Sequence, residues 1–199
     1  MDRNRAYADS LSGGRIGYVH MSAMDGGNWD RFIEDVFSKA KGKEGLILDV
    51  RFNNGGSIHD QVLTFLSRRR YAYSRGRGER DITYDALWRW DGPIVLLTNE
   101  RSYSDGEIFP AGFKALGLGK IVGMPTFGAV IGTNDVNLID GTGFLIPGTG
   151  WFRMDGVSLE NHPVEPDVLV RDVPEEGRHG RDLQLETGVR ECLKMIEGK

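Results

Sequence analysis

The sequence has 199 residues, of which 39% are hydrophobic and 27% are charged, an ordinary composition for one globular domain. The net charge of −4 argues against a nucleic-acid partner, and no apolar run approaches the roughly 20 residues that a membrane-spanning helix needs. The one cysteine, Cys192, excludes an internal disulfide, and the polar N-terminus has no signal-peptide character, so we expect a cytoplasmic protein.

Strands and helices are predicted to alternate along the chain. Residues 1–14 are polar and end in two glycines, which is typical of a linker before a domain at 15–199. Apolar or alternating runs predict strands at 15–21, 46–50, 93–97, 120–123 and 166–170. Helical spacing of apolar residues predicts helices at 28–40, 58–70, 108–116 and 181–197. This order favours an α/β fold with a largely parallel sheet.

Three further features have weaker patterns. Asn28 is a plausible N-cap for the helix at 28–40. Residues 71–92 are rich in arginine and are expected to be irregular. The Gly- and Thr-rich segment 125–153 holds short β-like pieces at 136–139, 144–147 and 151–153.

Two strand-to-helix turns are the places where chemistry is expected. One contains Gly55 and Gly56 after the strand at 46–50, and the other contains Ser104 and Asp105 after the strand at 93–97. In a parallel sheet such turns share the edge formed by the carboxyl ends of the strands. If the two strands are neighbours, the N–H groups of Gly56 and Asp105 converge on one oxygen atom beside the Ser104 hydroxyl. That arrangement is a nucleophile with an oxyanion hole.

Both turns also have simpler interpretations. Ser104 could be only the N-cap of the helix that follows, with Glu107 closing a capping box. The glycine pair could be an ordinary turn, or a phosphate cradle, although the spacing of a P-loop or dinucleotide-binding loop is missing.

Six motifs, in order along the chain, resemble the catalytic domain of the tail-specific (C-terminal processing) serine peptidases, and in particular their tricorn branch. They lie at 15–21, 49–56, 99–109, 117–123, 126–128 and 159–167. The resemblance covers about residues 12–197. It implies a crotonase/ClpP-like layered α/β domain, which agrees with the order of elements above.

The resemblance implies a role for each matching residue. Ser104 corresponds to the nucleophile, the N–H groups of Gly56 and Asp105 to the oxyanion hole, and Glu160 to the glutamate that orients the general base through a serine. Because the donors are backbone groups, Gly56→Pro is expected to be informative and Gly56→Ala is not.

Three residues are candidate substrate contacts: Gly55, His59 and Ser74. For His59 a role that only starts a helix is favoured over a substrate contact. Ser74 occupies the position where related enzymes carry an acidic residue that selects basic P1 side chains, so that preference is not expected here. The surrounding arginines could instead favour an acidic group or a C-terminal carboxylate, or they could be a solvated loop.

The general base is missing from the sequence pattern. Ala129 occupies the position of the lysine in the Ser–Lys dyad that most of these peptidases use. In the tricorn branch a serine and a histidine come from an upstream helical domain, followed by a PDZ domain, and neither domain is in this sequence. His20 is expected to be structural, His179 to be in an exposed loop, and His162 to be the best base candidate within the chain, although a loop role is favoured.

We therefore expect a serine endopeptidase domain that acts on peptides and receives its Ser–His pair from an upstream domain or a partner chain. No metal-ligand spacing is present, and no cofactor is expected. The resemblance also implies a homo-oligomer, for which the sequence shows no interface. The alternatives are a non-catalytic peptide-binding or assembly domain of the same fold, and a crotonase-like acyl enzyme.

Overall fold

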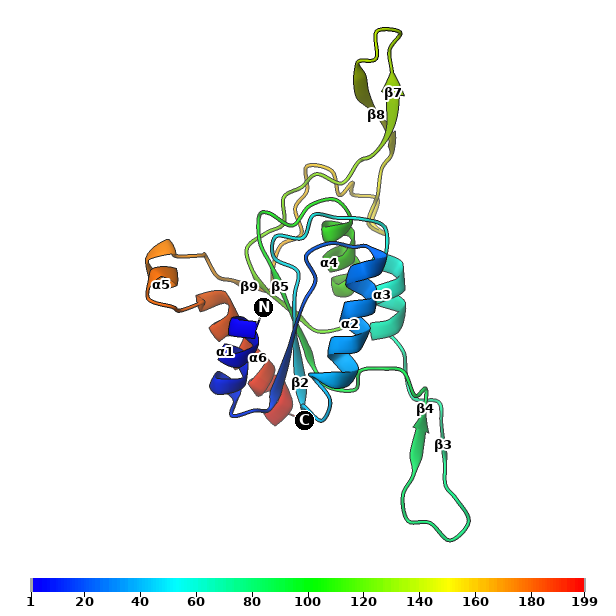
Figure 1. The fold of residues 1–199 in the computed structure, drawn as a ribbon, viewed down its shortest axis with the longest axis vertical. Coiled ribbons are helices and arrows are strands. Elements are labelled where there is room, and N and C mark those ends of the chain that lie inside the picture. The colour runs from blue at the N-terminus through cyan, green and yellow to red at the C-terminus, as the bar shows by residue number, and fades with distance from the viewer. Residues whose placement is uncertain (1, 199) are drawn as a thin grey trace.

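Five strands form one parallel sheet in the order β1–β2–β5–β6–β9 (Figure 1). The computed structural model describes residues 2–198, so Met1 and Lys199 lie outside it. The strands are β1 (Ile16–His20), β2 (Gly45–Asp49), β5 (Ile94–Thr98), β6 (Lys120–Gly123) and β9 (Val168–Leu169). All four neighbouring pairs are parallel, which confirms the predicted α/β fold.

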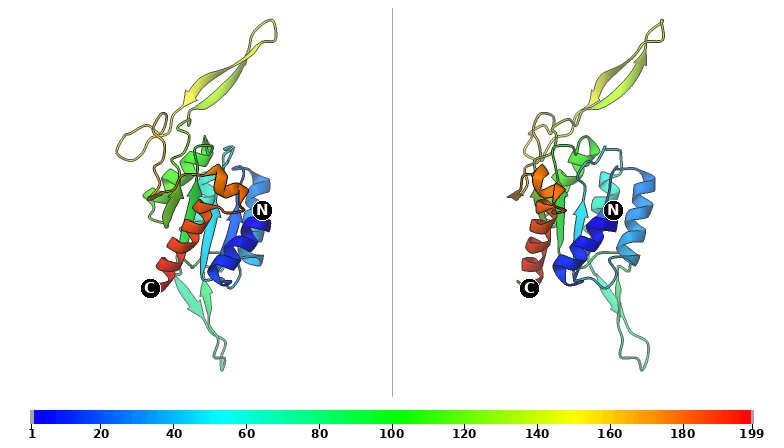
Figure 2. Two further views of the ribbon diagram at one scale, coloured as in Figure 1. Left: turned by 90° about the vertical axis from the view of Figure 1, so that its left-hand side faces the viewer. Right: turned by 60° about the vertical axis from the view of Figure 1, so that its left-hand side comes forward.

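Helices cover both faces of this sheet (Figures 1 and 2). One face carries α2 (Gly26–Ser38), α3 (His59–Leu66) and α4 (Asp105–Ala115), and the other carries α1 (Asp2–Ser12) and α6 (Leu183–Glu197). Every residue of β2 and β5 is buried, because alternate side chains point into the two helical layers. This explains why both strands are continuously apolar.

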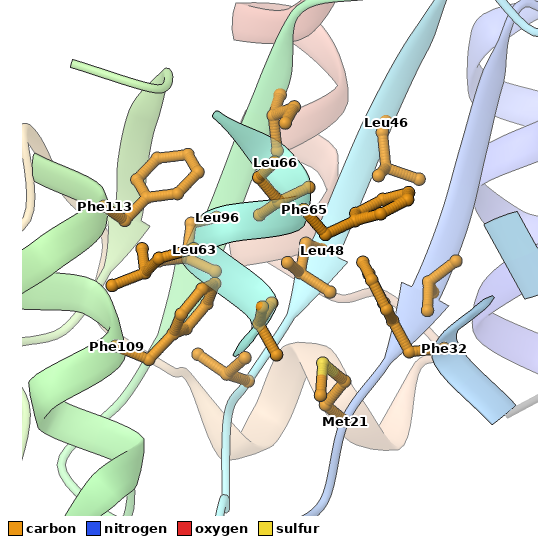
Figure 3. Packing of buried hydrophobic residues seen from close by; sticks show 14 of the residues in the cluster. Met21, Phe32, Leu46, Leu48, Leu63, Phe65, Leu66, Leu96, Phe109 and Phe113 are labelled. Carbon is orange, nitrogen blue, oxygen red and sulfur yellow. The ribbon is translucent and has the colours of Figure 1, made fainter. Parts of the chain in front are cut away.

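The larger core lies between the sheet and the layer of α2, α3 and α4 (Figure 3). The Phe65 ring of α3 meets the Phe32 ring of α2 edge to face, with centroids 5.5 Å apart. On the other side, α3 packs against α4 where Gly112 faces Leu63, and a side chain at Gly112 would overlap that leucine. These contacts fix the positions of α3, which follows the turn with Gly55 and Gly56, and of α4, which follows the turn with Ser104.

Two antiparallel hairpins project from opposite ends of the molecule (Figures 1 and 2). The first joins β3 (Ala72–Ser74) to β4 (Thr83–Asp85), within the segment expected to be irregular. The second joins β7 (Gly132–Asn137) to β8 (Gly143–Thr149), which places strands a few residues away from their predicted positions. Residues 151–153 are not a strand, since Phe152 makes only an isolated bridge to Ser158.

Two further local predictions were wrong, and one short helix was not predicted. Residues 2–12 were expected to belong to a linker, but they form α1, where Ala8 is fully buried and the Tyr7 hydroxyl donates to Glu186 (2.6 Å). The helix was missed because little of it is apolar. The N-cap of α2 is Asp25, whose carboxylate accepts from Asn28 N–H (2.8 Å), so Asn28 is not the cap. The short helix α5 (Pro174–Arg178) was not predicted.

Among residues 2–198, no helix combines the length and the apolar character that crossing a membrane requires.

Candidate active site

The two turns lie side by side at one edge of the sheet, as expected from neighbouring strands β2 and β5. Three hydrogen bonds tie them together. Phe52 N–H donates to Asn99 Oδ1 (2.9 Å), Tyr103 N–H donates to Asn53 O (3.2 Å), and Ser102 Oγ donates to the carbonyl of Val50 (2.7 Å). The two turns therefore form one unit at the carboxyl ends of the strands.

Ser104 has a backbone conformation that side chains rarely adopt, with φ of 57° and ψ of −126°. It immediately precedes α4, and its N–H donates to Ala129 O (2.9 Å). Its side chain makes no capping bond, and among the described residues its hydroxyl has no hydrogen-bond partner. The interpretation as a mere N-cap is therefore not supported, and the half-buried hydroxyl is available for other contacts.

Relieving this backbone strain should stabilise the protein. A non-glycine residue in such a region costs about 1–3 kcal/mol, and glycine avoids most of that cost. We expect Ser104→Gly to have a free energy of unfolding about 1 kcal/mol above that of Ser104→Ala, which keeps the Cβ atom. Urea unfolding of the two variants measures this difference, and a less stable glycine variant would show that Ser104 is not strained.

Glu107 does not close a capping box. Its carboxylate is buried and accepts hydrogen bonds from Thr126 Oγ1 (2.6 Å), Gly128 N–H (2.5 Å) and Ala129 N–H (2.8 Å). The predicted partner was the backbone of Ser104, one turn away along the helix. The side chain instead satisfies donors of a distant segment, the same one that holds the Ser104 N–H through Ala129.

The glycine pair lies directly against Ser104. A Cβ atom on Gly55 would lie 2.8 Å from Ser104 Cβ, so only glycine allows this approach. Met24 pairs with Gly56 as in a parallel sheet. Met24 N–H donates to Gly55 O (2.7 Å), and Ser57 N–H donates to Met24 O (2.8 Å). In such a parallel bridge, the N–H of the middle residue, Gly56, points away from Met24.

The two expected oxyanion donors are both unpaired. Neither the N–H of Gly56 nor the N–H of Asp105 donates to any acceptor among residues 2–198. Asp105 is the first residue of α4, where backbone N–H groups have no partner within the helix. Each of the two turns therefore contributes one backbone donor that has no acceptor among the described residues, and Gly55 of the first turn lies against Ser104 of the second.

The Asp105 side chain connects the two helix N-termini. Its Oδ2 accepts from the N–H groups of Ile58 (2.8 Å) and His59 (3.0 Å), and its Oδ1 bonds to the His59 ring at Nδ1. The bond to Asp105 raises the pKa of His59, against the opposing effect of burial. His59 thus lies at the predicted site, with its ring engaged by Asp105.

Glu160 is attached to the same region through the segment after Ala129. Its Oε2 accepts from the N–H groups of Val130 (2.7 Å) and Ile131 (3.1 Å). The other carboxylate oxygen, Oε1, has no partner among the described residues. Because Ala129 O bonds to Ser104, the chain from 129 to 131 links the nucleophile candidate directly to Glu160.

Ser74 does not lie at this site within one copy of the chain. It is exposed on β3, in the hairpin that leaves from the amino-terminal ends of the parallel strands, between α3 and β5. Ser104 follows the carboxyl end of β5, so the two residues lie at opposite edges of the sheet (Figure 1). The arginines around Ser74 are equally remote from the Ser104 hydroxyl.

None of the four histidines, all within the described part of the chain, bonds to Ser104. His20 Nε2 lies 3.4 Å from Arg51 O, and His162 Nδ1 lies 3.0 Å from the backbone oxygen of Glu160. His179 is exposed and pairs with Glu175, and His59 is held by Asp105. Residues 2–198 also contain no group of three or more histidine, cysteine or acidic side chains that could hold a metal ion.

Buried polar side chains also hold the two turns in place through hydrogen bonds. Asn53 is fully buried, and its amide donates to Met21 O (2.9 Å) and accepts from Gly55 N–H (2.8 Å). The Arg51 guanidinium bonds to Asp49 and to Asp182, which caps α6. The sequence pattern did not predict the support from Glu107, whose only signal was an acidic residue near a helix start.

A groove of about 640 Å³ adjoins this region on the outer side of α4. Its apolar lining includes Ile108 from the first turn of α4, and Trp151 and Leu159 from the loop that covers it. His162 also lines it, so the groove lies next to the loop that carries Glu160.

The parallel α/β fold carries a serine hydroxyl and two backbone N–H groups that have no partners among residues 2–198, which are the groups that a serine hydrolase site requires. Residues 15–170 match peptidase family S41, and the chain belongs to this family.

Proteins named tricorn protease are among its relatives. The chain is 40% identical over 197 residues to Tricorn protease homolog 1 of Streptomyces coelicolor, covering 97% of this chain and 18% of that protein. It is 37% identical over 198 residues to Tricorn protease of Thermoplasma acidophilum, covering 98% of this chain and 18% of that protein. The crystal structure of the tricorn protease matches with a TM-score of 0.88 at 34% identity, over 98% of this chain and 19% of that one. The chain therefore spans less than a fifth of the length of these proteins.

Proposed function

We propose that this chain is the nucleophile-bearing domain of a serine endopeptidase that cleaves peptides or protein tails. One observation carries this proposal most directly. The strained backbone of Ser104 holds a hydroxyl without a partner among residues 2–198, and the N–H groups of Gly56 and Asp105 also lack acceptors there. A strained backbone conformation has a cost in folding, so its occurrence beside two donors that lack a protein acceptor suggests selection for a ligand or reaction there.

In the proposed reaction, Ser104 Oγ attacks the carbonyl carbon of the scissile peptide bond. The hydroxyl proton passes to a general base, and the carbonyl oxygen becomes an oxyanion that accepts hydrogen bonds from Gly56 and Asp105 N–H. The intermediate then expels the amine, which takes the proton from the base, and leaves an acyl group on Ser104. Water, activated by the same base, releases the second product and restores the serine.

The base is proposed to come from outside this chain. No described histidine bonds to Ser104, and Ala129 at the position of the dyad lysine uses its backbone groups instead. The free Oε1 of Glu160 is a suitable acceptor for the hydroxyl of an incoming serine that would orient a histidine. The relatives are more than five times longer than this chain, which leaves room for a domain that supplies both groups.

Substrate selection at this site is proposed to depend first on Gly55, which lies against Ser104. The hypothesis that arginines near Ser74 recognise an acidic group requires the hairpin of a second copy, because the hairpin of the same copy is at the opposite edge. A strong preference for lysine or arginine at P1 in a peptide library would contradict that hypothesis.

A second candidate function is a peptide-binding module without catalysis. The observation that favours it is the lack of any described side chain that could take the proton of Ser104. The two functions differ in whether the hydroxyl can react.

Reaction with a fluorophosphonate probe distinguishes these functions. We expect the isolated chain to be labelled slowly at Ser104, because the oxyanion donors are present and the base is not, and faster in the parent protein. Mass spectrometry locates the label. Ser104→Ala should abolish it, whereas Ser57→Ala, which removes an exposed serine at the neighbouring turn, should not. If Ser104 stays unlabelled in the full-length parent protein, the peptidase proposal is wrong.

A further inference from the structure

Helix α3 has no N-cap of its own. Its N-cap residue, Ile58, has no side chain that can accept a hydrogen bond, and the cap comes instead from Asp105, the first residue of α4. By contrast, α2 is capped locally by Asp25, which bonds three residues ahead. One carboxylate therefore lies at the N-termini of two helices, where the helix dipoles favour negative charge.

The carboxylate is held in a fixed orientation. The Asp105 side chain is 3% exposed, Oδ2 accepts two backbone N–H groups, and Oδ1 bonds to the His59 ring. Since both oxygens are engaged, Asp105 cannot rotate without breaking a bond to α3. The His59 side chain is 25% exposed, so it lies between the buried Asp105 carboxylate and the solvent.

The Asp105 carboxylate and the His59 ring connect the two segments that carry the backbone donors of the proposed oxyanion hole. Gly56 lies two residues before Ile58, whose N–H is bonded to the carboxylate, and the second donor is the N–H of Asp105 itself. On its other side the Gly56 turn is held by backbone bonds of its neighbours to Ser22 and Met24, and by the Asn53 side chain. We propose that Asp105 and His59 are positioning residues that set the separation of the Gly56 and Asp105 N–H groups. This inference rests on the proposed function.

A role in positioning has a pH signature. The charged groups that face His59 are Asp105 from α4 and Asp60 from α3, and both favour the protonated ring. The pKa of folded His59 is raised above the ordinary histidine value of about 6.5. The pair therefore contributes its full stabilisation below about pH 6.5, and loses it as the pH rises through the raised pKa of the folded state.

Amide NMR tests the geometry without any reaction. We expect the Gly56 and Asp105 amide resonances of the wild-type chain to shift with the titration of His59. In His59→Gln, whose neutral amide can still donate to Asp105, the shift with pH should disappear. If the Gly56 resonance does not follow His59 in the wild-type chain, the inference is overturned.

Labelling of Ser104 by the fluorophosphonate probe tests the consequence. His59→Leu and Asp105→Asn should lower the second-order rate by at least tenfold, toward the roughly 10²–10³-fold loss typical of a missing oxyanion donor. The matched control is Asp140→Ala, which removes a carboxylate that accepts a backbone N–H, from Thr142, in the exposed turn between β7 and β8, and it should leave the rate unchanged. His59→Gln should retain more of the rate than His59→Leu.

The outcomes separate the two proposals. If wild-type Ser104 is labelled and the His59 and Asp105 variants only lose stability, the pair is structural and the inference fails while the proposed function stands. If wild-type Ser104 is never labelled but the Gly56 amide follows His59, the proposed function fails while the positioning geometry stands.

Discussion

Gly56→Ala is expected to lower the rate of fluorophosphonate labelling at Ser104 by about 10²–10³-fold, although the substitution removes no hydrogen-bonding group. A Cβ atom at Gly56 would overlap the carbonyl oxygen of Met24, and the φ of 150° is unfavourable for any side chain. The turn must move away from Met24, and its N–H moves with it. Overpacking of this kind also costs about 1–3 kcal/mol of stability.

The labelling rate and urea unfolding of Gly56→Ala measure these two effects. Gly26→Ala is the matched control, because a Cβ atom there meets no atom within 4 Å, and it should change neither quantity appreciably. The sequence alone indicated that alanine would be uninformative at Gly56, since alanine keeps the backbone donor. That prediction is wrong because the close approach of Met24 is a tertiary contact. A variant that is folded and fully reactive would show that Gly56 N–H is not an oxyanion donor.

Glu107→Ala is expected to lower the free energy of unfolding by at least about 3 kcal/mol. The substitution leaves two N–H groups and one hydroxyl, from Thr126, Gly128 and Ala129, without their acceptor, and each unsatisfied buried group costs about 1–3 kcal/mol. Ala129 also accepts the N–H of Ser104, so the labelling rate of the folded fraction should fall as well.

Urea unfolding compares Glu107→Ala with Glu107→Gln and Glu100→Ala. Glutamine keeps one acceptor oxygen but turns an amide group toward donors, so its loss should be smaller than that of alanine. Glu100 is exposed in the same segment after β5 and should tolerate alanine within about 0.5 kcal/mol. Equal stabilities for the Glu107 and Glu100 variants would mean that the buried carboxylate is not needed to hold residues 126–129.

Patterns that act over a few residues were predicted well. The apolar runs at 46–50 and 93–97 became β2 and β5 within one residue, because strands buried on both faces must be apolar throughout. The turns of Gly56 and Ser104 were correctly predicted to lie close together, because turns after parallel strands share the edge formed by the carboxyl ends of the strands. Helix α1 was missed because it buries few side chains and therefore shows little periodicity.

Predictions that depended on a partner distant in sequence were less successful. Glu107 satisfies the local pattern of a capping box, yet its carboxylate bonds to a segment about 20 residues further along. Ser74 was predicted to contact substrate because of its position in the sequence. Its hairpin leaves from the amino-terminal ends of the strands, so Ser74 lies away from the site of its own copy.

The sequence by itself determined the α/β layers, the edge at which the candidate site forms and the residues Gly56, Ser104 and Asp105 that occupy it. These follow from periodicity and from glycine and serine at strand ends, which are local properties of the chain. Only the tertiary structure decided that the Ser104 hydroxyl is unbonded among the described residues, that Glu107 supports the site from below and that Asp105 joins α3 to α4. A side chain such as Glu107 or Asp105 has several possible partners, and the choice among them depends on which donors the packed helices and strands bring within about 3 Å.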